Sequence, residues 1–257
     1  MFRRIWSHKD LVVSLVKIQY QLRYRQSFIG FAWALLPTLA TLGTAVLVFH
    51  KVVGLNTGKV PYATFTMAAL VPWTFFANSV SLAVTSVTGG LAAVTRLSFP
   101  RAVLPLSMVG LSLLDFVVSG FVFVAFAIIT RVGLPLTALW FPALVLIEVI
   151  LALGVSLLSS ALNVFARDLR LAVPLTIQLW LFVTPVMYPL QTVPPSIRGY
   201  YLANPMTGLV ESFRRVLVYG RAPSIGLLLP AIVGAAATFL IGYWYFAATE
   251  SRFADVI

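Results

Sequence analysis

The chain has no cysteine, only two histidines and only seven acidic residues among its 257 residues. Without cysteine it can form no disulfide, no thiolate metal site and no cysteine nucleophile. His8 and His50 are too far apart to form the paired histidines of a metal-binding helix, and no serine–histidine–carboxylate set is evident. The sequence therefore predicts no metal site and argues against catalysis by this chain.

A phosphate-binding loop is also missing. The nearest candidate, Gly54-Leu-Asn-Thr-Gly58-Lys59-Val60, has three residues between its glycines and a valine after its lysine. The motif requires four residues between the glycines, and Ser or Thr after the lysine. We therefore expect no ATP hydrolysis and no bound cofactor in this chain.

Polar surface is scarce as well: 60% of the residues are hydrophobic, and the mean hydropathy is +0.98. A soluble domain of this length needs far more polar residues. Six apolar stretches of at least 20 residues are each long enough to cross a hydrocarbon core of about 30 Å as a helix. The predicted fold class is an all-α integral membrane protein with six transmembrane helices. These stretches are Phe28–Phe49, Tyr62–Gly89, Ala102–Thr130, Pro135–Ala166, Leu171–Leu190 and Ala222–Thr249.

Positive charge is plentiful and unevenly placed. The net charge is +11, from 18 Lys and Arg against 7 Asp and Glu. The basic residues crowd the N-terminal segment and the second and fourth connections between the apolar stretches. Cytoplasmic loops of membrane proteins collect Lys and Arg, so we predict that both termini lie in the cytoplasm. No cleavable signal is predicted, because Met1–Arg25 has a basic start but no continuous apolar core.

An amphipathic helix is predicted before the first stretch. Ser7-His8-Lys9-Asp10 fits a capping box, with Ser7 as the N-cap and Asp10 reaching back to it. Such a helix lies along the cytoplasmic membrane surface, either as a simple anchor or also as the docking site of a cytoplasmic partner. Its apolar face consists of Leu11, Leu15, Ile18 and Leu22. Its polar face consists of Ser14, Lys17 and Gln21.

Proline interrupts the fifth stretch at Pro174, Pro185 and Pro189, and Pro194-Pro195 follow it. Proline frees helical carbonyls that then need another partner. The fifth span is therefore predicted to border a cavity or the interior of the bundle.

A second amphipathic helix is predicted to begin at Asn204-Pro205, with Asn as N-cap and Pro at the first helical position. Phe213 belongs to its apolar face, and Glu211, Arg214 and Arg215 form its polar face. Glu211 is expected to pair with Arg215 at i,i+4. An amphipathic helix between two spans suggests a re-entrant or interfacial gate on the outer side of the membrane.

Two ionisable residues fall inside apolar stretches, Asp115 in the third and Glu148 in the fourth. Ser112 and Ser119 are placed to satisfy Asp115 locally, whereas Glu148 has no polar neighbour at helical spacing. We interpret both as structural polar contacts, with Glu148 protonated or bonded to another span. The alternative is a proton-coupled secondary transporter that uses both carboxyls.

Hydroxyl and aromatic residues form stripes on the first and fifth stretches. Such side chains suit sliding contact with sugar rings, through stacking and hydrogen bonds. Ordinary helix packing and interfacial anchoring are the alternative explanation. The stripes consist of Trp33, Pro37, Thr41 and Thr44 in the first stretch, and of Thr176, Trp180, Thr184 and Tyr188 in the fifth.

Three parts of the chain, in order, carry a family resemblance. They are the sequence LRYRQSFIGFAWALLP at 22–37, LSFPRAVLP at 97–105, and NVFARDLR at 163–170 followed by TPVMYP at 184–189 and Asn204-Pro205. Together they resemble polysaccharide-type ATP-binding-cassette export permeases, most strongly the O-antigen (lipopolysaccharide) exporters. Teichoic-acid and capsule exporters are near relatives.

The resemblance implies a homodimer of six-span subunits in the bacterial inner membrane, each paired with a cytosolic ATPase that binds ATP and Mg. The substrate would be a glycan on undecaprenyl diphosphate, moved to the periplasm through a channel in the dimer, and no nucleic acid is involved. One permease domain is implied over 1–257. It comprises an interface helix at 1–27, spans one to five at 28–190, a periplasmic gate segment at 191–221, span six at 222–249 and a cytoplasmic tail at 250–257.

The resemblance also assigns roles to residues. The residues implied to couple to the ATPase are Lys9, Lys17, Arg96, Phe99, Pro100, Arg101, Arg167 and Asp168. The channel is implied to be lined by Trp33, Thr41, Thr44, Thr176, Trp180, Thr184 and Tyr188. The gate is assigned to Pro194, Asn204, Pro205 and Phe213.

Arg23 and Arg25 are candidates for capturing the lipid diphosphate, because arginine binds phosphate well; simple positive-inside anchoring is the alternative.

An exporter of the same architecture for a drug or small lipid is a competing function. A membrane-embedded glycan-processing enzyme is disfavoured by the missing catalytic cluster.

Overall fold

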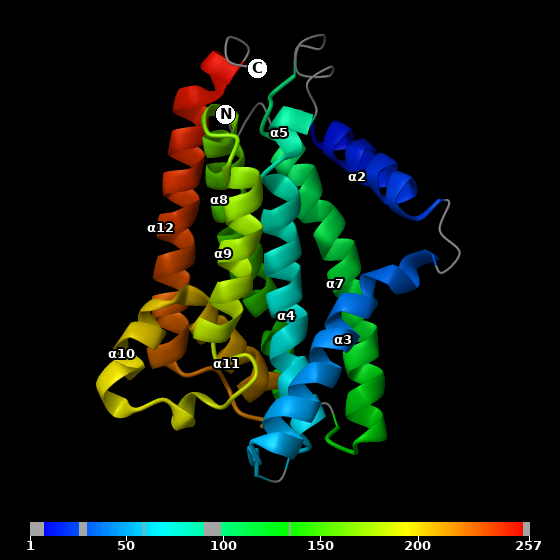
Figure 1. Ribbon diagram of the computed structural model, residues 1–257, viewed down its shortest axis with the longest axis vertical. Helices are drawn as coiled ribbons and strands as arrows, with labels where there is room; N and C mark the ends of the chain where they lie inside the picture. The colour runs from blue at the N-terminus through cyan, green and yellow to red at the C-terminus, as the bar shows by residue number, and fades with distance from the viewer. Residues whose placement is uncertain (1–7, 26–29, 59, 90–98, 134, 254–257) are drawn as a thin grey trace.

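A computed structural model describes residues 8–25, 30–58, 60–89, 99–133 and 135–253. All regular structure in these residues is helical (Figure 1). Lipid offers no hydrogen-bond partner, so a chain in a membrane closes its backbone hydrogen bonds within helices. The all-α prediction is confirmed for these residues. The longer helices are α2 (Lys9–Tyr24), α3 (Leu36–Ala45), α4 (Tyr62–Ala83), α7 (Val103–Ile129), α8 (Phe141–Phe165), α9 (Leu169–Val183), α10 (Pro195–Ala203), α11 (Pro205–Leu217) and α12 (Ile225–Thr249).

Short helical segments extend or join these helices. A π-helical segment, Val46–Val52, continues α3, and a 3-10 turn, Leu136–Trp140, leads directly into α8. The short helix α5, Ser86–Gly89, follows α4. The other 3-10 turns are Gly30–Ala34, Leu190–Thr192 and Glu250–Arg252.

Within the part of the chain that the structure describes, four helical units are long and apolar enough to cross a membrane: Tyr62–Ala83, Val103–Ile129, Leu136–Phe165 and Ile225–Arg252. Their lengths of 22 to 30 residues exceed or match the ~20 residues that a span requires. They coincide with the second, third, fourth and sixth apolar stretches of the sequence.

The other two apolar helices are shorter. Leu36–Val52 and Leu169–Val183 fall in the class of 10–17 residues and, at 1.5 Å per residue, reach at most about 25 Å. The second of them stops because Thr184 precedes Pro185 and takes an extended conformation, with φ −93° and ψ 133°. Six complete spans and a periplasmic location for the segment after α9 therefore remain predictions.

Two local predictions concern the ends of helices. The predicted N-cap Ser7 lies outside the described residues; α2 begins at Lys9, and His8 before it makes no side-chain capping bond. Of the prolines in the fifth stretch, Pro174 lies inside α9 without ending it, and the helix ends just before Pro185. Proline inside a membrane helix is tolerated where neighbours satisfy the freed carbonyl, so its presence alone does not fix a helix end.

Helix α4 forms the centre of the bundle. It packs against α3, α7, α8, α9 and α11, and 72% of its most apolar window is buried, compared with 17% for α12. Its buried residues include Thr64, Thr66 and Ser79, small hydroxyl residues of the kind that are common where membrane helices pack together. The outer helices keep apolar residues on their free faces, as helices in contact with lipid do.

Helices α8 and α12 cross at two glycines. A Cβ on Gly154 would lie 2.5 Å from the backbone nitrogen of Phe239, and a Cβ on Gly242 would meet the Gly154 carbonyl oxygen. Only glycine permits this approach of the two backbones, and small residues commonly bring membrane helices together in this way.

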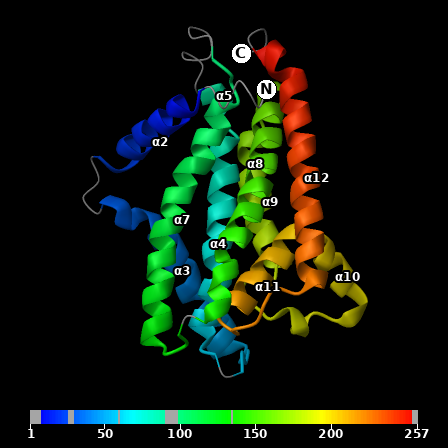
Figure 2. The ribbon, with the colours of Figure 1, turned by 180° about the vertical axis from the view of Figure 1, so that it is seen from behind.

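The two ends of the bundle differ. Helix α2 and the end of α12 lie at one end, whereas α10 and α11 lie at the other (Figure 1; seen from behind in Figure 2). Helix α2 lies outside the bundle against α7, where Val16 packs onto Gly110: a Cβ on this glycine would come within 2.9 Å of the valine Cγ2. We call the end with α2 the α2 end and the opposite one the α11 end.

Candidate functional site

The α11 end is built around the break that follows α9. Residues 184–189, with the sequence TPVMYP, leave the helix, so their carbonyl groups have no intrahelical partners. Buried carbonyls without a partner are costly. We call this stretch the 184–189 strap.

Arg214, from α11, satisfies these carbonyls. Its Nη1 donates to the carbonyl oxygens of Pro185 at 2.6 Å and Tyr188 at 3.4 Å, and its Nη2 donates to that of Val186. The side chain is fully buried. One guanidinium thereby replaces the backbone partners that three strap carbonyls lost where α9 ended.

Arg214 also contacts α4 and its own helix. Its Nε donates to the Phe65 carbonyl oxygen at 3.3 Å, and its Cζ lies 3.7 Å from the centre of the Phe65 ring, within cation–π range. Its Nη1 lies 2.8 Å from Glu211 Oε1, so the buried charge has a carboxylate partner. A single side chain therefore joins α4, α11 and the strap, and we call this arrangement the outer junction.

The predicted pairing within α11 is wrong. Glu211 pairs with Arg214 at i+3, and Arg215 donates from Nε to the Ala222 carbonyl oxygen at 3.0 Å. Both arginines are within helical reach of Glu211, so spacing alone could not decide between them. The acceptors that draw Arg214 inward belong to α4 and the strap, which are remote in the sequence.

Further bonds fix the strap and α11. The N-cap prediction at Asn204 is confirmed, because its Oδ1 accepts a hydrogen bond from the Met206 backbone N–H at 3.1 Å. Asn204 Nδ2 also donates to Thr184 Oγ1 at 3.0 Å, and the Tyr62 hydroxyl donates to the Met187 carbonyl oxygen at 2.7 Å. The α11 end is thus closed by polar contacts from several elements.

The four residues assigned to a gate occupy different environments. Pro194 is exposed at the start of α10, and Asn204 caps α11. The Pro205 ring packs on α12 at Gly234, where a Cβ would lie 2.9 Å from the proline Cβ. Phe213 is fully buried, with its ring 5.7 Å from that of Phe141. Their role in gating remains a prediction.

The residues assigned to channel lining divide into two groups. Thr44 and Thr176 are exposed and Thr41 is half-buried, and each hydroxyl donates to the carbonyl four residues earlier in its own helix. Trp33 is also exposed, at 53%. Helices α3 and α9, which carry the threonines, lie in front of α4 in the view of Figure 1.

The second group lies against the bundle. Trp180 packs edge-on to Phe76 at 5.4 Å, and Thr184 is fully buried beneath Asn204. The Tyr188 hydroxyl donates to the Phe182 carbonyl oxygen at 2.8 Å. These three side chains serve packing within this single chain, while the exposed group presents hydroxyls and an aromatic ring at its surface.

Near the middle of α7, where the C-terminal end of α2 reaches it, Asp115 has partners that the sequence did not suggest. Arg23 Nη1 lies 3.0 Å from Asp115 Oδ2, and the Tyr24 hydroxyl donates to Oδ1 at 3.0 Å. The predicted local partner Ser112 donates instead to the Met108 carbonyl oxygen at 3.1 Å, so the expectation of local satisfaction is wrong. We call the contact of Arg23 and Tyr24 with Asp115 the inner junction.

The electrostatics of the inner junction favour a neutral tyrosine. Burial, followed by the negative charge of Asp115, raises the pKa of Tyr24 to about 12. Tyr24 is therefore a hydrogen-bond donor across the physiological range. The Arg23 side chain is 38% exposed, whereas that of Asp115 is 7% exposed. Of the two arginines assigned to lipid capture, Arg23 is thus paired with Asp115, whereas Arg25 is exposed.

The residues assigned to ATPase coupling lie at the α2 end. Lys9, Lys17, Arg167 and Asp168 are exposed on α2 and in the turn between α8 and α9, whereas Phe99 and Pro100 are half-buried. Arg96 lies outside the described residues. The described members of this set lie at the same end of the bundle, and their role there remains a prediction.

Arg101 is tied to the end of α12. Its backbone N–H donates to Glu250 Oε1 at 2.7 Å, and its Nη1 donates to the Glu250 carbonyl oxygen. Its guanidinium carbon lies 6.0 Å from the centre of the Phe253 ring. Movement of the segment before α7 would therefore be passed to α12.

Glu148 contrasts with Asp115. It is fully buried in α8, and neither carboxyl oxygen has a hydrogen-bond partner among the described residues. A charged carboxylate in such a site is costly. Of the two states predicted for it, the protonated one fits this environment, whereas a bond to another span is not found in the described part of the chain.

Comparisons with known proteins show that the chain is similar to membrane transporters. Residues 10–218 match the family described as ABC-2 type transporter. The chain is 32% identical over 264 residues to the O-antigen export system permease protein RfbA of Myxococcus xanthus, covering 100% of this chain and 99% of that protein. It is 28% identical over 249 residues to RfbA of Klebsiella pneumoniae, covering 96% and 95% of the two chains. The polysialic acid transport protein KpsM of Escherichia coli is 23% identical over 217 residues, or 82% and 83% of the two chains.

Proposed function

The chain belongs to the ABC-2 type transporter family, and from this membership we propose that it is the membrane subunit of an ATP-driven polysaccharide exporter in a bacterial inner membrane. Two copies form the channel, and each copy binds one cytosolic ATPase subunit that carries ATP and Mg. The cargo is a glycan carried on undecaprenyl diphosphate, which moves from the cytoplasm to the periplasm. The observation that carries this proposal is the end-to-end similarity to permeases named for O-antigen export.

The exposed faces of α3 and α9 support a glycan as cargo. Their threonines present hydroxyl oxygens that remain able to accept hydrogen bonds, and Trp33 presents an aromatic ring. Sugars combine hydroxyl groups with apolar ring faces, so a surface of this kind binds them weakly at many points. Weak binding allows a long chain to slide.

The α2 end supports docking of an ATPase. It gathers exposed basic residues on α2 and in the α8–α9 turn. Two structural links run from this end into the bundle, the inner junction to α7 and the Arg101–Glu250 contact to α12. A push on this face would therefore be transmitted as a rigid-body movement of helices.

The state of the two carboxyls weighs against proton coupling. Asp115 is held by two partners, and Glu148 is sealed from solvent in this chain. A proton relay needs groups that exchange protons with water in sequence along a path. Both carboxyls are better explained by structural roles.

Copurification with the ATPase tests the proposal. The tagged full-length chain, isolated from its own host in mild detergent, should bring with it an ATPase whose hydrolysis is vanadate-sensitive and stimulated by the lipid-linked glycan. Arg167→Glu, in the exposed α8–α9 turn, should lower the recovered ATPase at least tenfold. Arg221→Glu, an exposed arginine at the α11 end, is the matched control and should leave recovery unchanged. Glycan transport by this chain without any ATPase would overturn the proposal.

A further inference from the structure

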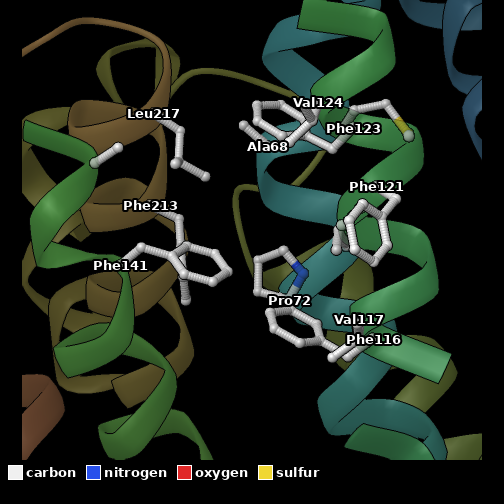
Figure 3. A pocket seen from close by; sticks show the side chains of 14 residues that line it. Ala68, Pro72, Phe116, Val117, Phe121, Phe123, Val124, Phe141, Phe213 and Leu217 are labelled. Atoms are coloured by element: carbon white, nitrogen blue, oxygen red, sulfur yellow. The ribbon is translucent and has the colours of Figure 1, made fainter. Parts of the chain in front are cut away.

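A cavity of about 320 Å³ opens between α7 and α8, and no function so far described uses it (Figure 3). Phe141, Phe213 and Leu217 line one side, and Ala68, Pro72 and Val124 line the other. All its lining residues are apolar or glycine. A site without polar groups offers nothing to a sugar, a phosphate or water.

The mouth of this cavity lies where hydrocarbon is the expected neighbour. Val117 and Phe121 at the mouth are 49% and 72% exposed, and both lie near the middle of α7, which is long and apolar enough to be a span. Helices α7 and α8 are in front in the view of Figure 2, on the face opposite to α3 and α9. The cavity therefore opens away from the face that carries the predicted channel residues.

We propose that this cavity holds one hydrocarbon chain of a bilayer lipid, inserted sideways between α7 and α8. An apolar cavity of ~150 Å³ stays dry and holds a molecule of benzene; by proportion, this one accommodates about a dozen carbon atoms. An empty cavity forfeits the dispersion contacts of its lining atoms. A lipid chain restores them without moving a polar group.

The inner wall of the cavity connects a bound lipid chain to helix α11. Phe213 and Leu217 belong to α11, the helix that carries Arg214. The Phe141 ring bridges the wall, stacked on Phe116 at 5.9 Å and edge-on to Phe213 at 5.7 Å. A chain in the cavity therefore fills the space between α11 on one side and α4 and α7 on the other. The stability of the α11 end then depends on the lipids present.

A photoreactive lipid tests this placement. The full-length chain is reconstituted in bilayers that contain phosphatidylethanolamine with a diazirine midway along one acyl chain, irradiated and mapped by mass spectrometry. Phe213 and Leu217 lie on the inner wall, across the cavity from Val117 and Phe121 at the mouth, so a lipid reaches them through the cavity and not from the outer surface. Adducts on these two residues are expected in the wild type. Adducts on Ile128, which is 67% exposed on α7, report ordinary surface lipid.

Filling the cavity provides the matched comparison. A Cβ on Gly120, at the cavity wall, meets no atom within 4 Å, so Gly120→Leu is expected to fit and to occupy the space. Ala138→Leu fills it from the opposite side and serves as a second variant. Gly226→Leu, on α12 outside the cavity and equally open, is the control.

Both filling variants should lower the adducts on Phe213 and Leu217 at least tenfold, leave those on Ile128 unchanged, and make thermal stability less sensitive to added lipid. Absence of adducts on α11 in the wild type would overturn the proposal. So would cross-links that show the side chains of a second copy in the cavity, or full labelling of α11 in both filled variants.

Discussion

The outer and inner junctions use the same chemistry with different burial. Arg214 is fully buried and is shared among four backbone carbonyls, one carboxylate and one aromatic ring. Arg23 is 38% exposed and binds one carboxylate, which a tyrosine also holds. The two carboxylates are equally buried, at 7% exposed, so the junctions differ in the arginine. Arg214 cannot reach water, whereas Arg23 can turn to solvent while the Tyr24 hydroxyl keeps its bond to the Asp115 carboxylate. We therefore expect the outer junction to be the firmer joint and the inner one to open more easily.

This difference fits a transporter whose force arrives at one end. The inner junction joins α2, which carries residues assigned to ATPase docking, to α7. A joint that exchanges with water at small cost lets α2 move relative to α7. The outer junction keeps the broken end of α9 attached to α4 and α11 while other helices shift.

The largest expected effect is that of Arg214→Met. This change leaves Glu211 charged in a buried site and frees the strap carbonyls, so the free energy of unfolding should fall by about 3–5 kcal/mol. Arg214→Lys should recover only part of the loss, because an ammonium cannot reproduce the planar fork. Thermal unfolding in detergent measures both. Arg215→Met is the matched control, since that side chain is half-buried with one backbone bond, and it should cost about 1 kcal/mol or less. Equal losses for the two arginines would remove the distinction between the junctions.

A smaller effect is expected from Asp115→Asn. The tyrosine hydroxyl keeps an acceptor, while the half-exposed Arg23 turns to water, so the loss of stability should be about 1 kcal/mol. The change should act mainly on α2, seen as faster amide hydrogen exchange in 9–24 with little change in α11. Lys17→Gln, on an exposed position in the middle of α2, serves as the control and should leave exchange nearly unaltered. Uniform destabilisation of the whole bundle would show that the inner junction is as fixed as the outer one.

The smallest effect is expected from Glu148→Gln. The carboxyl has no bonded partner among the described residues, so exchanging it for a neutral amide of similar size should change the free energy of unfolding by less than about 1 kcal/mol. ATP-driven export should persist. Loss of export with normal assembly would assign Glu148 a functional role and revive the proton-coupled alternative.

The main helices could be predicted because membrane crossing depends on the length of apolar runs, which is a local property. The runs around α4, α7, α8 and α12 all became long apolar helices. Asn204 was also predictable as an N-cap, since its acceptor role uses an amide two residues away. Signals confined to one helix were sufficient for these features.

The junctions could not be predicted, because their partners are far apart in the sequence. Asp115 lies 92 positions from Arg23, and the Phe65 carbonyl lies 149 positions from Arg214. Helical spacing offered Ser112 and Arg215 as nearer partners, and tertiary contacts overrode both. An unexplained arginine in an amphipathic helix beside a proline-broken span was the one available signal for the outer junction, because broken helices leave carbonyls that need donors.

The central claim is that ATP hydrolysis by a partner drives glycan export through this chain. Proteoliposomes that contain the chain, its ATPase and a lipid-linked polysaccharide test it most directly, with the glycan on the far side detected by an impermeant lectin or glycosidase. We predict export that requires ATP and the ATPase, is blocked by vanadate and is indifferent to a proton gradient. Export by the chain alone in response to a proton gradient would contradict the account.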